Sequence, residues 1–256
     1  MNKHIATNVI FFVALMCLFF LNTVHAIGWY WYAIPIFLYL LVSSIGSYFI
    51  QLNYFTHSYC SGDRNKPQIA ITFDDGPNDH TAKVLDILKV EKVPATFFCI
   101  GQRIKSNEST LSRIQAEGHL IGNHSFGHKT TFPLQSSGAI AKEIQKCSEA
   151  IRSVIHKRPL LFRPPFGVTD PMVASGIKRS GMYSIGWSLR SYDTVIASSD
   201  KLLQKLNTVS NGDVILFHEA GLQTANVLSQ FIKNARAKGF EIIPLDQLLG
   251  IQPYEK

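Results

Sequence analysis

The chain has 256 residues, of which 46% are hydrophobic and 17% charged, and its formal net charge is +7. This length suits one large domain or two small ones, and the hydrophobic content excludes an intrinsically disordered chain. The basic residues are scattered and form no run with interleaved aromatic residues, so we expect no nucleic-acid partner. The four cysteines contain no CxxC pair, which argues against a disulfide framework and against a cysteine-based zinc site.

Formal charges are absent from most of the N-terminal part. Between Lys3 and Asp63 lie 59 residues without Asp, Glu, Lys or Arg, whereas the part from Asp63 onward has a net charge of +6. This uncharged stretch holds two apolar runs, at residues 9–24 and 29–50. At about 1.5 Å per residue the second run can cross a bilayer core of about 30 Å, and its aromatic start resembles an interfacial belt. We expect residues 1–56 to form a membrane anchor and residues 57–66 a linker.

The first apolar run allows two interpretations. It can be a second transmembrane helix, or a signal peptide, because Lys3, an apolar core and the small residue Ala26 follow one another in the required order. A buried helix of a soluble protein is disfavoured, because two uncharged runs lie back to back. If both runs cross, Lys3, Arg64 and Lys66 flank the pair on one side, and the positive-inside rule then favours a cytoplasmic C-terminal domain.

From Gln68 onward, short apolar runs alternate with amphipathic stretches. Strands are expected at 69–73, 95–100, 119–124, 160–164, 183–187, 214–219 and 240–245. Helices are expected at 79–91, 106–117, 136–156, 170–180, 199–209 and 223–238. This alternation predicts an α/β fold with a parallel sheet, and seven strands favour a distorted (β/α)7 TIM-like barrel at residues 67–252 over two domains.

Polar or aromatic side chains follow five of the expected strands. They are Asp74 and Asp75, His124, Arg163, Trp187 and His218. In a parallel barrel the carboxyl ends of the strands meet on one face, where active sites are built. We therefore expect these side chains to lie together.

Three of these positions suggest a metal site. In a regular strand, neighbouring residues such as Asp74 and Asp75 cannot both point inward, so one carboxylate is expected to bind a metal and the other to face a bound water. His124 and His128 are spaced to meet on one side of a helical turn. Asp75, His124 and His128 would form a set of two histidines and one carboxylate that leaves metal positions open for water and substrate. Zinc is the metal expected for hydrolysis, although the same ligands suit non-haem iron.

Two further motifs fit a hydrolytic site. The loop Arg163-Pro164-Pro165-Phe166-Gly167 is stiffened by two prolines, and its backbone N–H groups could stabilise an oxyanion. His218 stands beside an acid near a strand end, which suits general acid–base work. Taken alone, each motif also fits a purely structural interpretation. The loop can be only a stiff turn, and His218 only a structural histidine.

Five motifs in this order resemble those of the polysaccharide deacetylases, carbohydrate esterase family 4. They are TFDDGP, GNHSFGH, FRPPFG, WSLRSYD and LFHE, and the resemblance covers roughly residues 66–249. It implies a barrel of the NodB homology type. It also implies metal-dependent removal of the acetyl group from an N-acetylated sugar, in an oligo- or polysaccharide such as chitooligosaccharide or peptidoglycan.

The resemblance also implies roles for single residues. Asp74 would be the general base, Arg163 the residue that pairs with it, His218 the general acid and Asp193 the carboxylate that holds His218. Asp75, His124 and His128 would be the metal ligands. Pro165, Phe166 through its backbone N–H, Trp187 and Leu216 would bind the substrate.

The chain departs from the family pattern at four positions. Arg190 stands where the family usually has an acid, Thr194 where it has tryptophan, Phe166 where it has tyrosine and Glu219 where it has aspartate. The first two affect the expected substrate rather than the reaction. Two other functions therefore stay open: a deacetylase or deformylase of a lipid-linked amino-sugar precursor, and an inactive carbohydrate-binding homologue.

Overall fold

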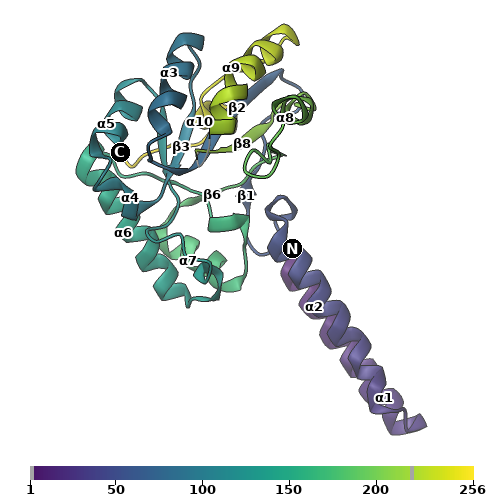
Figure 1. Cartoon of the computed structure of the whole chain (residues 1–256). Coiled ribbons are helices and arrows are strands. Elements are labelled where there is room, and N and C mark those ends of the chain that lie inside the picture. The colour runs from purple at the N-terminus through teal and green to yellow at the C-terminus, as the bar shows by residue number, and fades with distance from the viewer. Residues whose placement is uncertain (1–2, 220–221) are drawn as a thin grey trace.

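A helical hairpin and an α/β domain make up the chain in the computed structural model, which describes residues 3–219 and 222–256 (Figure 1). The hairpin consists of α1 (Lys3–His25) and α2 (Ala33–Tyr48), joined through a 3-10 turn at Trp29–Tyr32. Tyr39 Oη on α2 donates to Asn8 Oδ1 on α1 at 3.1 Å. Apart from this mutual packing, the apolar side chains of both helices point outward, and α1 has no buried residue.

Parallel strands form the centre of the α/β domain. They are β1 (Ser58–Tyr59), β2 (Gln68–Gly76), β3 (Thr96–Cys99), β4 (Leu120–Asn123), β5 (Leu161–Phe162), β6 (Tyr183–Ile185), β7 (Leu189–Arg190), β8 (Val214–His218) and β9 (Glu241–Ile242). Their order is β1-β6-β5-β4-β3-β2-β8-β7, with β9 paired to β2. β7 is one end of this path and β6 is next to the other end, so the short segment 183–190 connects its two sides and the sheet must curl. The predicted parallel barrel is confirmed, and β1 and β7 are additional to the strands expected.

Helices surround the strands (Figure 1). They are α3 (Thr81–Glu91), α4 (Gly101–Ile104), α5 (Glu108–Ala116), α6 (Ser137–Ile155), α7 (Pro171–Ser180), α8 (Ser199–Leu206), α9 (Leu222–Ala237) and α10 (Leu245–Leu249). The six expected helices correspond to α3 and α5–α9. Side-chain caps help to define their starts: Asp170 Oδ1 accepts from the backbone N–H of Val173 at 2.7 Å at the start of α7.

The two-residue period of the strands separates two cores. Ala70 on β2 and Leu216 on β8 belong to the core inside the barrel, whereas Ile71 and Phe217 point outward to the core beneath the helices. Continued along β2, the same alternation directs the Asp74 side chain into the barrel mouth. The strand period therefore carries polar side chains to the place where the barrel opens.

The hairpin is joined to the barrel by specific contacts. Ile50, just after α2, is 1% exposed and packs into the core inside the barrel. The backbone N–H of Thr169 donates to Ser47 O at 3.0 Å. Residues 57–66, expected as a linker, contribute β1, which pairs with β6. Ser58 Oγ and Ser184 Oγ are 2.7 Å apart across this ladder.

Candidate active site

A pocket of about 90 Å³ opens at the carboxyl ends of the strands. Its walls are Asp74, Asp75, His124, His128, Phe166, Gly167, Trp187, Arg190, Leu216 and His218. Arg163, Pro165 and Asp193 are buried next to these lining residues. The structure thus brings the predicted site residues together, although they come from segments far apart in the sequence.

Both adjacent carboxylates face this pocket, so the expectation that only one could point inward was wrong. The register between β2 and β3 shifts at this point, because Asp74 pairs with Phe98 and Gly76 already pairs with Cys99. Asp75 is the extra residue of this bulge and has a φ of 69°, in the left-handed region. A bulge bends the strand and redirects a side chain. Here it turns the Asp75 carboxylate to the same side as that of Asp74.

Asp75, His124 and His128 converge on one point. Asp75 Oδ1 lies 3.7 Å from His124 Nε2 and 3.5 Å from His128 Nε2. One ligand atom from each of the three residues lies within 4.8 Å of the other two. Ligand atoms about 2.1 Å from a tetrahedrally bound ion are about 3.4 Å apart, so the two contacts to Asp75 fit a shared metal ion.

The hydrogen bonds of these ligands support the same interpretation. His124 Nδ1 lies 2.8 Å from Arg163 O, and a carbonyl oxygen can only accept, so Nδ1 carries the proton and Nε2 is left as a free electron pair toward the pocket. Asp75 Oδ1 is buried and has no hydrogen-bond partner among the described residues. A buried carboxylate oxygen without a partner is costly unless a cation or water occupies the site. The residues therefore fit a divalent metal ion.

Electrostatics keep His128 in the state that a ligand needs. Burial and, less strongly, the neighbouring His124 lower the pKa of His128 to about 4, although Asp75 and Asp74 act in the opposite direction. The ring is therefore neutral at pH 7, as metal coordination requires. Its backbone has a φ of 47°, and its N–H donates to Ser125 Oγ at 3.0 Å.

Arg163 is buried with no exposed surface and positions Asp74. Its Nη1 donates to Asp74 Oδ1 and to Thr72 Oγ1, each at 2.8 Å, and its Nη2 donates to Gly186 O at 2.8 Å. The guanidinium also lies 4.1 Å from the centre of the Phe98 ring. Burial lowers the pKa of Arg163 and the charge of Asp74 raises it, with a net lowering. Asp74 Oδ2 remains directed toward the metal ligands, 3.8 Å from His124 Nε2.

His218 and Asp193 form a second pair in the same pocket, where His218 on β8 stands in register with Asp74 on β2. His218 Nδ1 lies 2.9 Å from Asp193 Oδ1, and the His218 backbone N–H donates to Asp193 Oδ2 at 2.7 Å. Burial lowers the pKa of His218, but the hydrogen bond to Asp193 and the charges of Asp74, Asp193 and Asp75 outweigh it, so the net shift is upward. Burial raises the pKa of Asp193, but its bonds to His218 outweigh this effect and lower it. The pair thus favours a protonated imidazole beside a carboxylate.

The loop after β5 and the ring of Trp187 form the remaining walls. Phe166 has a φ of 60° and is 47% exposed at the rim. Gly167 has a φ of 69°, and a Cβ there would lie 2.2 Å from the Trp187 ring, so this position requires glycine for both reasons. Leu216 closes the floor and is 1% exposed. These side chains form the apolar part of the pocket lining.

Several supporting residues were not found from the sequence. The Thr72 hydroxyl donates to Ile215 O at 2.7 Å and accepts from Arg163. The Thr224 hydroxyl on α9 donates to Asp193 Oδ2, and Arg103 Nη1 donates to the carbonyl oxygen of Asp75. The sequence around a threonine in a strand or helix does not indicate that its hydroxyl forms such a hydrogen bond. Only the inward position of Thr72, two residues before Asp74, could have indicated its role.

Glu219 lies behind the two carboxylates. It is fully buried, with Oε2 bonded to the Thr81 hydroxyl and Oε1 without a partner among the described residues. A Cβ on Gly76 would lie 2.3 Å from Glu219 Oε1. Burial raises the pKa of Glu219 to about 8, and the charges of Asp75 and Asp74 act in the same direction. Glu219 is therefore mostly protonated at pH 7.

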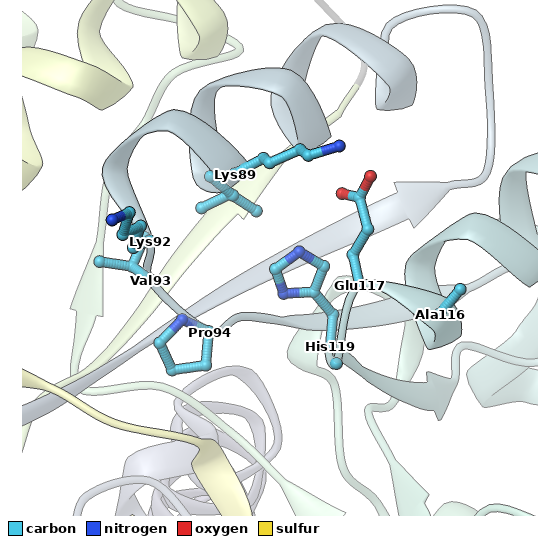
Figure 2. Close-up of a pocket in the computed structure, with 9 residues that line it drawn as sticks. Lys89, Lys92, Val93, Pro94, Ala116, Glu117 and His119 are labelled. Atoms are coloured by element: carbon cyan, nitrogen blue, oxygen red, sulfur yellow. The ribbon is translucent and has the colours of Figure 1, made fainter.

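A larger hollow, of about 540 Å³, lies at the other end of the barrel, where β3 and β4 begin (Figure 2). Figure 2 shows the His119 ring in its wall with Pro94 and Glu117. Burial lowers the pKa of His119 to about 4, and its Nδ1 accepts from the Ala95 N–H at 3.2 Å. His119 is thus a neutral structural side chain, and the residues lining this hollow offer no cluster like that of Asp75, His124 and His128.

Comparison with known proteins agrees with this site. The family model "Polysaccharide deacetylase" matches residues 61–185. The peptidoglycan-N-acetylglucosamine deacetylase of Bacillus cereus is 31% identical over 192 residues, which cover 72% of this chain and 89% of that protein. The peptidoglycan-N-acetylmuramic acid deacetylase PdaC of Bacillus subtilis is 32% identical over 191 residues, which cover 73% of this chain but 39% of that protein.

Solved structures show the same fold. The Bc1960 peptidoglycan N-acetylglucosamine deacetylase superimposes with a TM-score of 0.73 at 28% identity, over 77% of this chain and 95% of that chain. The chitin deacetylase of Colletotrichum lindemuthianum does so with a TM-score of 0.73 at 26% identity, over 78% and 95%. The chain belongs to the polysaccharide deacetylase family. The predicted enzyme class, a hydrolase of carbon–nitrogen bonds in N-acetylated sugars, is confirmed by these relatives.

Proposed function

We propose that this protein is a membrane-anchored, metal-dependent deacetylase that releases acetate from an N-acetylated oligo- or polysaccharide. The observation that carries the proposal is the arrangement of one pocket. It holds the three candidate metal ligands Asp75, His124 and His128 together with the Arg163-paired carboxylate of Asp74 and the Asp193-paired imidazole of His218. A general base and a general acid that face the same pocket are what amide hydrolysis requires.

The proposed reaction assigns one task to each group. A divalent ion held by Asp75, His124 and His128 would activate water and polarise the amide carbonyl. Asp74 Oδ2 accepts the proton of the attacking water, while Arg163 holds Oδ1 in place. The Phe166 N–H donates to the developing oxyanion.

Protonation of the leaving group is assigned to the pair of His218 and Asp193. His218 protonates the departing sugar nitrogen, which is otherwise a poor leaving group. Asp193 holds the ring through Nδ1, so that Nε2 carries the transferred proton. Trp187 and Leu216 form the walls around the acetyl methyl group. Zinc is the proposed metal, because it suits two imidazoles and a carboxylate and needs no redox partner.

Membrane anchoring is proposed from the hairpin. The helical segments Lys3–His25 and Trp29–Tyr48 are long and apolar enough to cross a membrane by length and composition. Large apolar side chains on them face outward, for example Ile10 at 70% and Trp29 at 81% exposure. In water such a surface would associate, whereas in a bilayer it is the stable arrangement. The basic residues around the hairpin favour a catalytic domain on the cytoplasmic face.

An inactive carbohydrate-binding homologue is the second candidate, because the structural neighbours include a Bacillus anthracis protein described as a family 4 pseudoenzyme, with a TM-score of 0.70 and 26% identity. This chain has a complete set of the residues that catalysis would need. Asp75, His124 and His128 converge, Asp74 pairs with Arg163, and His218 pairs with Asp193. These pairs favour the enzyme.

Acetate release decides between the two functions. The purified full chain would be incubated with chitooligosaccharides, peptidoglycan and lipid-linked N-acetyl sugars, and acetate measured. Release from any of them supports the enzyme, and binding without release supports the carbohydrate-binding protein. Alkaline phosphatase fused after Lys256 reports the side of the membrane, and an active fusion would place the domain outside and contradict the cytoplasmic proposal.

A further inference from the structure

Arg190 lies in the wall of the pocket with no partner for its charge. It belongs to β7 and stands opposite Leu216 on β8, and both residues line the pocket. Its Nε is buried and has no hydrogen-bond partner among the described residues. A buried guanidinium N–H without an acceptor is costly, so such a group in a binding pocket indicates a ligand that supplies the acceptor.

The acidic groups of the pocket are engaged by other residues, and Asp75 lies with His124 and His128. Asp74 is bonded to Arg163, and Asp193 is bonded to His218. No ion pair joins Arg190 to any acidic group in the described residues. The positive charge of Arg190 is therefore available to a molecule that enters the pocket.

The surroundings of Arg190 fix the direction of its side chain. Its guanidinium carbon lies 5.8 Å from the centre of the Trp187 ring and 5.2 Å from that of the Tyr192 ring. Two aromatic faces hold the planar group without using its N–H donors. The fork of donors stays free for an acceptor with two oxygens.

We propose that Arg190 binds an oxyanion, a carboxylate or a phosphate, carried by the same substrate whose acetamido group is hydrolysed. This inference rests on the proposed deacetylase function and names its substrate class: N-acetylated sugars with an acidic substituent near the acetamido group. Two sources share this chemistry, a sugar acid in a cell-wall glycan and a sugar phosphate on a lipid carrier. Arg190 is thus a specificity-determining residue.

The test compares substrates that differ in charge. The full chain in detergent would be assayed with neutral chitotetraose, with an oligosaccharide containing N-acetylmuramic acid and with a polyprenyl-diphosphate-linked N-acetylglucosamine. The measured quantity is the ratio of kcat/KM for each anionic substrate to that for chitotetraose. In Arg190→Gln this ratio is expected to fall about 10- to 100-fold, the usual effect of losing a charge-assisted pair of hydrogen bonds.

Matched variants separate this role from a general charge effect. Arg190→Lys keeps the charge but loses the fork, so its ratio should lie between those of the wild type and Arg190→Gln. Lys205 is a nearby cation, 5.9 Å from the Tyr192 ring, and does not line the pocket. Lys205→Gln should therefore leave the ratio at the wild-type value.

Each outcome has a defined meaning. A ratio that falls only for the N-acetylmuramic acid substrate assigns the carboxylate source, and one that falls only for the lipid-linked substrate assigns the phosphate source. A ratio unchanged in Arg190→Gln overturns the inference, as does a wild type that prefers chitotetraose.

If no acetate is released from any substrate, the proposed function is contradicted. The inference about Arg190 is then tested by binding. Equilibrium binding of N-acetylmuramic acid and of N-acetylglucosamine would be measured with the wild type and with Arg190→Gln. A preference for the acidic sugar that disappears in the variant supports the inference, and the absence of any preference in the wild type overturns it. Thermal unfolding of each variant identifies one that fails to fold, in which case the Arg190→Lys ratio decides.

Discussion

Gln51, the first polar residue after the apolar hairpin, donates from Nε2 to the carbonyl oxygen of Trp187 at 3.1 Å. Trp187 is at the same time a wall of the active-site pocket. The neighbouring Ile50 is buried in the core inside the barrel, together with Trp187. The end of the proposed membrane anchor is therefore part of the support of the active site.

Truncation of Ile50 tests this support. Ile50→Ala removes a buried side chain and should lower the free energy of unfolding by about 2–4 kcal/mol. It should also lower kcat, because Trp187 loses part of its packing. Thermal unfolding and acetate release in detergent measure both effects. Ile36→Ala, at a position on α2 that is 45% exposed, is the control and should change neither; equal effects of the two variants would show that the anchor does not support the site.

The base and the metal ligands should respond differently to substitution. Asp74→Asn keeps the shape of the side chain and should keep the metal, while kcat falls about 10²- to 10⁴-fold through loss of the general base. His124→Ala should lose metal and activity together. Metal content and turnover are measured on the same samples, with Asp79→Asn as an exposed control. Near wild-type turnover of Asp74→Asn would show that Asp74 is not the base.

Metal removal should be reversible. Chelation is expected to abolish acetate release, and added zinc or another divalent ion to restore it, because Asp75, His124 and His128 leave open positions for water and substrate. The order of restoring ions reports the preferred metal. Full activity in a dialysed sample shown to be free of metal would contradict the mechanism.

The pH profile should report the His218–Asp193 pair. The pKa of His218 is raised, and a general acid must be protonated, so activity should be lost as the pH rises through this raised value. Asp193→Asn removes the bond that favours the charged ring. Its activity should therefore disappear at lower pH than in the wild type. The profile of kcat against pH measures the shift, and an unmoved alkaline limb would exclude His218 as the acid.

Glu219 should make stability depend on pH. Its folded pKa is about 8, above its ordinary value of 4.5, so the folded state binds a proton that the unfolded state has already lost between these two values. The free energy of unfolding should thus decrease as the pH rises through this window, by at most about 1.4 kcal/mol per pH unit. Glu219→Gln should lose this dependence. Denaturant unfolding at several pH values measures it, with Glu108→Gln as the exposed control, and an identical dependence in Glu219→Gln would contradict the buried, protonated state.

The sequence by itself determined most of the helices, most of the strands and most of the residues in the pocket. Helical periodicity and strand alternation are properties of neighbouring residues, so they can be read from short windows. The alternation that places Ala70 inside the barrel also places Asp74 there, and the five motifs mark the same strand ends.

The tertiary structure alone decided how these residues are used. The bulge at Asp75 turns its carboxylate to the same side as that of Asp74, although the strand period predicts opposite sides. The bond of Thr72 to Ile215 spans 143 positions, and that of Arg163 to Asp74 spans 89. The lack of an ion-pair partner for Arg190 among the described residues can be recognised only in the folded structure. Local patterns cannot determine such features, because their energies come from groups that only the folded chain brings into contact.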